Sequence, residues 1–236
     1  MRTHVAGAYN RAVSIRPGHV FRRTDGEPAA DLTEHRITHR GIELDLHRLA
    51  VVAAEFTSAP KTQSDARWAA LGDYLTALSL TTSSHLRVDT GCLANLLTAV
   101  TDLPTTPRAD GSLRLLRLLA EAQDTVSTSG EPCDDSTGER LAAVLTEAAQ
   151  ISCSLFGRQE RVLFPLILEY VRAADYRWVQ EQFRAELPPG LLAFVVPWTM
   201  RHATAEEVPA LNDPTLCVTR RIFGRRFTIV ESQLFA

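Results

Sequence analysis

The chain has 236 residues, 45% of them hydrophobic, and its 25 basic and 28 acidic side chains give a formal net charge of −3. This length allows a buried core in one domain with appendages, and the slightly negative charge argues against nucleic acid as a partner. The most apolar run, Leu191 to Met200, is too short to cross a bilayer, so we expect no membrane partner. The scattered cysteines show no paired spacing. We therefore expect a cytoplasmic protein with reduced thiols.

Four long stretches with helical periodicity dominate the chain. Within each stretch apolar residues recur every three or four positions, which is typical of helices that bury one face. Capping boxes at Asp31 and Ser136 mark the starts of the first and the last stretch. The expected helices cover, in chain order, residues 31–56, 64–96, 112–127 and 136–174. Joined by short polar loops, they predict an all-α, up-down four-helix bundle over residues 31–174.

The regions on either side of this bundle show weaker patterns. Residues 1–30 lack a hydrophobic period and are rich in Arg, Gly and Pro, so we expect a flexible N-terminal arm. Residues 175–236 predict a C-terminal helical extension, with a short apolar helix through Trp198 and another that starts at Thr204. The last stretch, Cys217 to Ala236, alternates enough to predict a strand-like wrap. Apolar residues of the extension could cover the bundle interior or form the contact of a homodimer, and the sequence leaves both open.

The second helix carries the pair around which we expect the site to be organised, His85 and Asp89, four residues apart. On a helix this spacing turns both side chains toward the same neighbour. An imidazole and a carboxylate that face a bundle interior need a metal, a partner side chain or a wet pocket, because unpaired polar groups are costly to bury. A local kink is also expected, since Gly91 and the preceding Thr/Ser run weaken the helix.

Three segments of the bundle and one of the extension resemble motifs of a known family. They are His39 to Leu46, His85 to Leu96, Gln159 to Pro165 and Phe194 to Trp198. In their order and spacing these segments resemble a hemerythrin-like (HHE cation-binding) domain of the kind with a C-terminal helical extension. The resemblance covers roughly residues 31–211. It implies a helical bundle that holds two irons through five histidines and two bridging carboxylates.

Only part of that ligand set is present. The resemblance assigns the ligands of one iron, together with the two bridging carboxylates, to His39, His85, Asp89 and Glu160. The histidines of the other iron are missing. The third helix contains none, with Gln123 as its nearest candidate, and Leu155 stands where the fourth helix would supply one. The resemblance therefore implies a diiron site that has lost one half.

Two readings of this reduced site remain open. In the first, the four residues hold a single Fe(II), Mn(II) or Zn(II) ion, which could activate oxygen or lower the pKa of a bound water. In the second, no metal binds, and the same side chains form a buried hydrogen-bonded network or an acid–base pair. In either reading His85, Asp89 and Glu160 are the expected catalytic residues.

We expect the space beside the site to hold a small organic ligand. Leu155 would leave an apolar hollow, and Leu119 and Gln123 on the third helix would complete this substrate pocket. The protein is then an enzyme or a ligand-binding protein of small-molecule metabolism. The alternative is a non-haem iron protein that binds or senses dioxygen or nitric oxide. His35 and His202 are expected at the surface, although His35 would join the ligands if the helix register differed by one turn.

Overall fold

The computed structural model describes residues 20–58, 65–101, 109–129, 135–188, 190–211 and 214–235. Within these ranges the regular structure is helical, and an isolated bridge pairs Ala29 with Arg172. The predicted all-α class is therefore confirmed. None of the helices in these ranges is both long enough and apolar enough to span a membrane.

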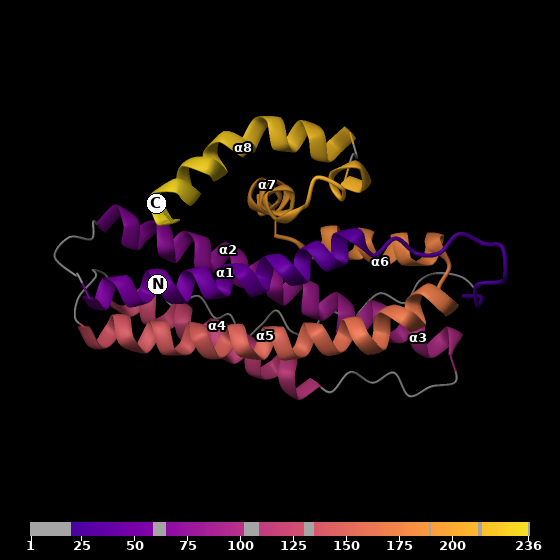
Figure 1. Cartoon of the computed structure of the whole chain (residues 1–236), viewed down its shortest axis with the longest axis horizontal. Helices are drawn as coiled ribbons and strands as arrows, with labels where there is room; N and C mark the ends of the chain where they lie inside the picture. Colours follow the sequence, from indigo (N-terminus) through magenta and orange to yellow (C-terminus); the bar gives the residue numbers. More distant parts are fainter. Residues whose placement is uncertain are drawn as a thin grey trace.

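Four long helices form the body of the molecule: α1 (Thr33–Ser58), α2 (Asp65–Val88), α4 (Ala109–Ser129) and α5 (Asp135–Tyr170). They run side by side, with α1 packed on α5 and α2, and α4 packed on the same two helices (Figure 1). Leucine stripes explain this packing, because Leu71, Leu75 and Leu78 lie on one face of α2 and are fully buried.

The second helix is interrupted where the sequence predicted a kink. After α2 ends at Val88, one π-helical turn, η3 (Asp89–Leu93), leads into α3 (Ala94–Val100). A π turn holds one more residue than an α turn, and such turns often occur at functional sites. Here Asp89 is the first residue of the widened turn and is buried.

The last long helix and the N-terminal segment meet at one end of the molecule. Helix α5 continues through Pro165 but stops at Tyr170, short of the predicted end, and α6 (Ala173–Glu186) follows it. The backbone amide of Arg23 donates to the carbonyl of Tyr170 at 2.9 Å, near the bridge between Ala29 and Arg172. Residues 20–30 of the predicted arm are thus packed against the body, and residues 1–19 lie outside the described ranges.

The C-terminal extension crosses the body as helices α7 (Leu192–His202) and α8 (Pro214–Phe235). In Figure 1 α7 lies between α8 and the long helices. The predicted strand-like wrap is wrong, because that segment belongs to α8 and buries Phe227 and Leu234 on one helical face. The helix predicted from Thr204 is only a 3-10 turn, η4 (Val208–Leu211).

A buried carboxylate joins the extension to the body. Asp45 on α1 accepts hydrogen bonds through Oδ2 from Tyr74 Oη at 2.5 Å, Trp198 Nε1 at 2.8 Å and His202 Nε2 at 3.1 Å. His202 is 8% exposed, so its predicted surface position is wrong. Helices α1 and α7 also approach closely, since a Cβ atom on Gly41 would lie 2.6 Å from the Trp198 ring.

Candidate metal centre

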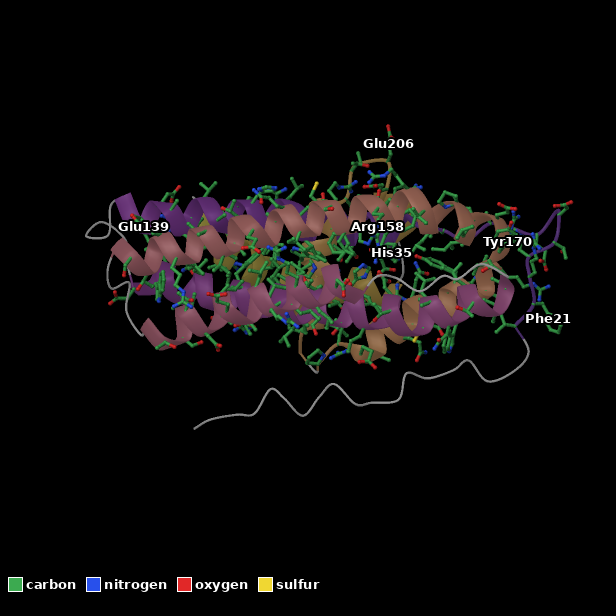
Figure 2. All side chains as sticks on the ribbon, turned by 90° about the horizontal axis from the view of Figure 1, so that it is seen from below. Phe21, His35, Glu139, Arg158, Tyr170 and Glu206 are labelled. Carbon is green, nitrogen blue, oxygen red and sulfur yellow. The ribbon has the colours of Figure 1, made fainter. Side chains whose placement is uncertain are left out.

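Three helical segments bring four potential metal ligands together. His35 and His39 lie one turn apart on α1, His85 lies near the end of α2, and Asp89 opens the π turn. Each offers one ligand atom, and these atoms all lie within 4.8 Å of one another. All four side chains are buried, and His35, labelled in Figure 2, lies between the helices. This cluster could hold a metal ion.

Among the residues that the structure describes, three of the inward-facing atoms have no hydrogen-bond partner. They are Nε2 of His39, Nε2 of His85 and Oδ2 of Asp89. The Asp89 oxygen lies 3.4 Å from His85 Nε2 and 3.5 Å from His35 Nε2, in contact but without a hydrogen bond. Each unsatisfied buried polar atom costs about 1–3 kcal/mol, so three that face one another need an explanation. A metal ion would satisfy all of them.

Hydrogen bonds on the outer side orient two of the histidines. Nδ1 of His39 lies 2.9 Å from Oε1 of Glu160, and Nδ1 of His35 lies 2.9 Å from the hydroxyl of Tyr176. A carboxylate only accepts, so His39 donates from Nδ1, and the lone pair of its Nε2 then faces the cluster. Histidines that bind metals in proteins are commonly held in this way by a carboxylate or another acceptor.

Phenylalanine rings surround the imidazoles. Phe156 stacks on His39 with ring centres 4.2 Å apart and planes 10° apart. Phe164 meets His35 edge-on at 5.2 Å, and Phe183 meets His85 edge-on at 5.9 Å. These rings make the surroundings of the imidazoles largely apolar, which strengthens electrostatic interactions inside the cluster.

Burial sets the charge of the cluster. Burial, with His35 and His85 nearby, holds the pKa of His39 well below its usual value. Burial also lowers the pKa of His85 to about 4, although the Asp89 carboxylate opposes it. Burial alone would raise the pKa of Asp89, but His85 and His35 outweigh it, and the pKa is lowered. At neutral pH His39 and His85 are therefore uncharged and Asp89 is ionised, which are the protonation states that a metal ion requires.

A small cavity reaches the cluster between α1, α2 and α6. It has a volume of about 30 Å³ and is lined by His35, His85, Asp89 and Tyr176, with the half-buried Gln180 at its edge. A volume of this size holds a water-sized molecule.

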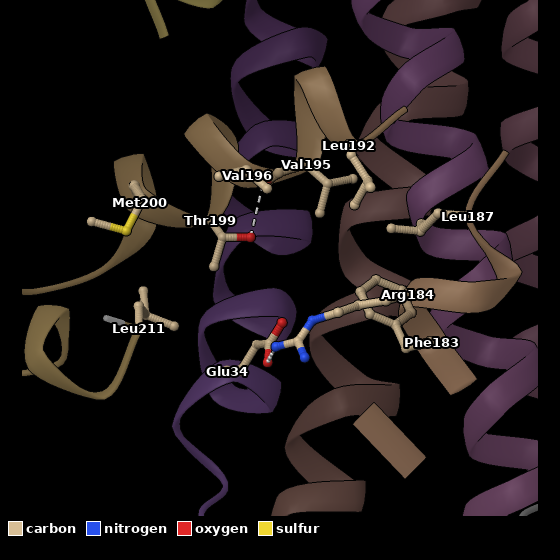
Figure 3. Close-up of a pocket in the computed structure, with 10 residues that line it drawn as sticks. All are labelled: Glu34, Phe183, Arg184, Leu187, Leu192, Val195, Val196, Thr199, Met200 and Leu211. Atoms are coloured by element: carbon tan, nitrogen blue, oxygen red, sulfur yellow. Dashed lines mark hydrogen bonds and ion pairs between the residues drawn. The ribbon is translucent and has the colours of Figure 1, made fainter. Parts of the chain in front are cut away.

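A second cavity of about 20 Å³ adjoins the first, because Glu34 and Phe183 line both. Figure 3 shows its largely apolar wall from α6 and α7 and the ion pair between Arg184 and Glu34 at its edge, 3.0 Å long. The two cavities described at and beside the cluster are therefore both small.

The structure brings together three of the four predicted ligands, His39, His85 and Asp89. Glu160 lies outside the cluster, where it holds His39 and is 38% exposed. His35 takes the fourth position, so the expectation that it is exposed is wrong. The sequence did contain the signal, because His35 and His39 are spaced to share one face of α1.

The predicted substrate pocket gains no support from the packing. Leu119 and Leu155 belong to the hydrophobic core and are 2% and 9% exposed, and Gln123 on α4 is half-buried. Phe156, next to Leu155, fills the space beside His39 where the sequence suggested a hollow. A ligand at Leu119, Gln123 and Leu155 stays a prediction.

Comparison with family models, curated proteins and solved structures found no match to this chain. The resemblance to hemerythrin-like domains therefore rests on the motifs alone.

Proposed function

We propose that this protein binds one transition-metal ion through His35, His39, His85 and Asp89, within an up-down, hemerythrin-like four-helix bundle. The observation that carries the proposal is the set of three buried atoms that have no hydrogen-bond partner among the described residues, in a cluster whose ligand atoms lie within 4.8 Å of one another. In the arrangement that the structure shows, direct hydrogen bonds from the described residues leave these atoms unsatisfied, and a partly satisfied buried network is costly. The metal reading accounts for them.

If the site reacts with a small molecule, the ligand set favours Fe(II) or Mn(II) over Zn(II). Three imidazoles and a carboxylate suit Fe(II), Mn(II) and Zn(II). Zinc with four protein ligands is usually closed and structural, whereas iron and manganese accept further ligands. A redox-active ion with free positions would supply electron transfer to a small bound molecule.

The adjoining cavity limits the size of that molecule. Pockets for organic ligands usually measure about 300–1,000 Å³. The space at His35, His85 and Asp89 is about 30 Å³. We therefore propose that the metal centre binds water, dioxygen, nitric oxide or an anion of similar size, and acts as a non-haem centre that binds or senses such a molecule.

Metal content tests the proposal. Protein purified without chelator is reconstituted with Fe(II), Mn(II) or Zn(II) and analysed by elemental analysis, beside His35→Ala, His85→Ala and the control His47→Ala. His47 lies on α1 and is exposed. We expect about one ion per chain in wild type and control, and a large loss in the other two variants. No bound metal in wild type would contradict the proposal.

The iron-loaded protein then tests whether the centre binds a small ligand. Adding nitric oxide or azide should change its electronic absorption and electron paramagnetic resonance spectra, because the proposed ion has free positions beside the cavity. Unchanged spectra in a protein that holds iron stoichiometrically would indicate a closed, structural centre.

A further inference from the structure

A larger cleft lies between α2, α7 and α8, apart from the metal centre. Its volume is about 460 Å³, and it shares no lining residue with the metal cluster. Much of its wall is apolar and comes from three helices: Ala77, Leu80, Ala193, Phe194, Phe227 and Val230. This volume lies in the range of pockets that bind small organic molecules.

Aromatic rings that hold one another in place form part of the wall. Phe194 meets Tyr74 edge-on with ring centres 5.1 Å apart and meets Phe227 at 5.6 Å. The Tyr74 hydroxyl is fixed by its hydrogen bond to Asp45. Such a preformed aromatic surface suits an apolar, ring-bearing ligand, because few side chains would have to be ordered on binding.

Two opposite charges lie on different walls of the cleft. Arg226 lies on α8 and Asp73 on α2, and both are exposed. Within the described ranges neither side chain forms an ion pair. Arg226 is therefore free to bind a carboxylate, for which a guanidinium is the best-suited side chain. Asp73 would repel a second negative charge on the same ligand.

We propose that this cleft binds a small monocarboxylate with an apolar, preferably aromatic body, whose carboxylate pairs with Arg226. The body contacts Phe194 and Phe227, and Asp73 disfavours dicarboxylates. This site is separate from the proposed metal function, so either proposal can fail while the other holds.

Titration calorimetry with three probes tests the cleft. The probes are 3-phenylpropionate, the neutral 3-phenylpropan-1-ol and the dicarboxylate phenylsuccinate. We expect wild type to bind 3-phenylpropionate saturably and about tenfold more tightly than either other probe. Arg226→Gln should bind the acid and the alcohol equally. Asp73→Asn should reduce the difference in affinity between the monocarboxylate and the dicarboxylate.

Matched variants separate the cleft from the surface around it. Arg225→Gln removes an exposed arginine of α8 that does not line the cleft, and it should bind like wild type. Ala193→Phe should abolish binding of all three probes by filling the cleft, and Ala77→Phe provides the same test from α2 if the first variant fails to fold. Three results would overturn the proposal. They are no binding of 3-phenylpropionate by wild type at several millimolar, equal affinities of wild type for the acid and the alcohol, and unchanged binding in a cleft-filling variant that folds.

Discussion

Two carboxylates near the centre, Asp89 and Glu160, occupy different positions relative to the histidines. Asp89 is 3% exposed and faces the ligand atoms, whereas Glu160 is 38% exposed and contacts His39 from its outer side. The sequence motif predicted the same bridging role for both. The structure separates them, because one helix turns its carboxylate inward and the other presents it beside an imidazole. Their substitution should therefore have different consequences.

Glu160→Gln should weaken metal binding by about 10–100-fold without unfolding the protein, since it removes the charge that orients and polarises His39. Competition with a chelating dye measures the affinity. The control is Glu147→Gln, an exposed glutamate of the same helix that pairs with Arg114 at the surface. Equal affinities for wild type and Glu160→Gln would show that this hydrogen bond does not support the centre.

Asp45→Asn should lower the free energy of unfolding by about 3–5 kcal/mol, because it breaks a buried carboxylate network while leaving its donors in place. Denaturant titration at pH 7 measures this loss. Asp45 is fully buried and joins Tyr74, Trp198 and His202. A variant within 1 kcal/mol of wild type would contradict the assigned role.

The same carboxylate predicts a pH dependence. Burial would raise the pKa of Asp45, but the hydrogen bonds from His202, Tyr74 and Trp198 outweigh it and lower the pKa. The contribution to stability is therefore complete above the unfolded-state pKa of about 3.9 and is lost as the pH falls through the lower folded-state value. Wild type should lose this stability below about pH 4, and Asp45→Asn should lose less over the same interval.

At the scale of single elements, the close approach of α1 and α7 makes Gly41 a sensitive position. Gly41→Ala should destabilise the protein by about 1–3 kcal/mol, because the new methyl group would overlap the buried Trp198 ring. Gly157→Ala on α5 is the control, because its Cβ would lie an ordinary 3.4 Å from the Arg161 side chain. Alanine favours a helix over glycine, so this variant should raise the free energy of unfolding by up to about 1 kcal/mol. Thermal unfolding compares the two. Equal changes in melting temperature for the two variants would contradict the close packing of Gly41 against Trp198.

The long helices could be predicted because their apolar stripes have one period over many turns. Helix α8 could not be recognised from Phe223, Phe227 and Ile229, since these positions fit alternation as well as a helix. In the structure Phe227 and Leu234 are buried and Ile229 is 48% exposed, which is the pattern of one helical face. Short segments with few apolar residues leave this ambiguity, and only packing against a partner resolves it.

The ligand set could be predicted in part for a similar reason. The spacing of His85 and Asp89 places both on one side of a helix whichever partner they face. The rotation of α5 about its own axis is set by contacts such as Phe156 with His39. No local pattern encodes that rotation, so the position of Glu160 outside the cluster could not be predicted. The position of His35 could have been, because its four-residue spacing from His39 places both on one face of α1.

At the scale of the whole molecule, the centre ties α1 to the segment that joins α2 and α3. Metal binding should therefore stabilise the fold, by about 2.7 kcal/mol at a free metal concentration 100 times the Kd. Thermal unfolding with Fe(II), Mn(II) or Zn(II), and again with excess chelator, measures this effect.

His85→Leu should lose the metal-dependent shift. In chelator it should be at least as stable as wild type, because it removes a buried polar atom that has no partner. A chelated wild type that is clearly more stable than His85→Leu would show that the histidines already satisfy one another.

The π turn at Asp89–Leu93 makes the length of this helical segment as important as its composition. A π turn is equivalent to one residue inserted into an α-helix, and each residue turns an α-helix by about 100°. With that residue present, Leu71, Leu75 and Leu78 of α2 before it and Leu93, Leu97 and Val100 after it are all buried. Loss of a single codon here would rotate α3 relative to α2 and carry its leucines away from the core. Folding of this protein should therefore tolerate many substitutions between Asp89 and Leu93 better than the in-frame deletion of one residue there.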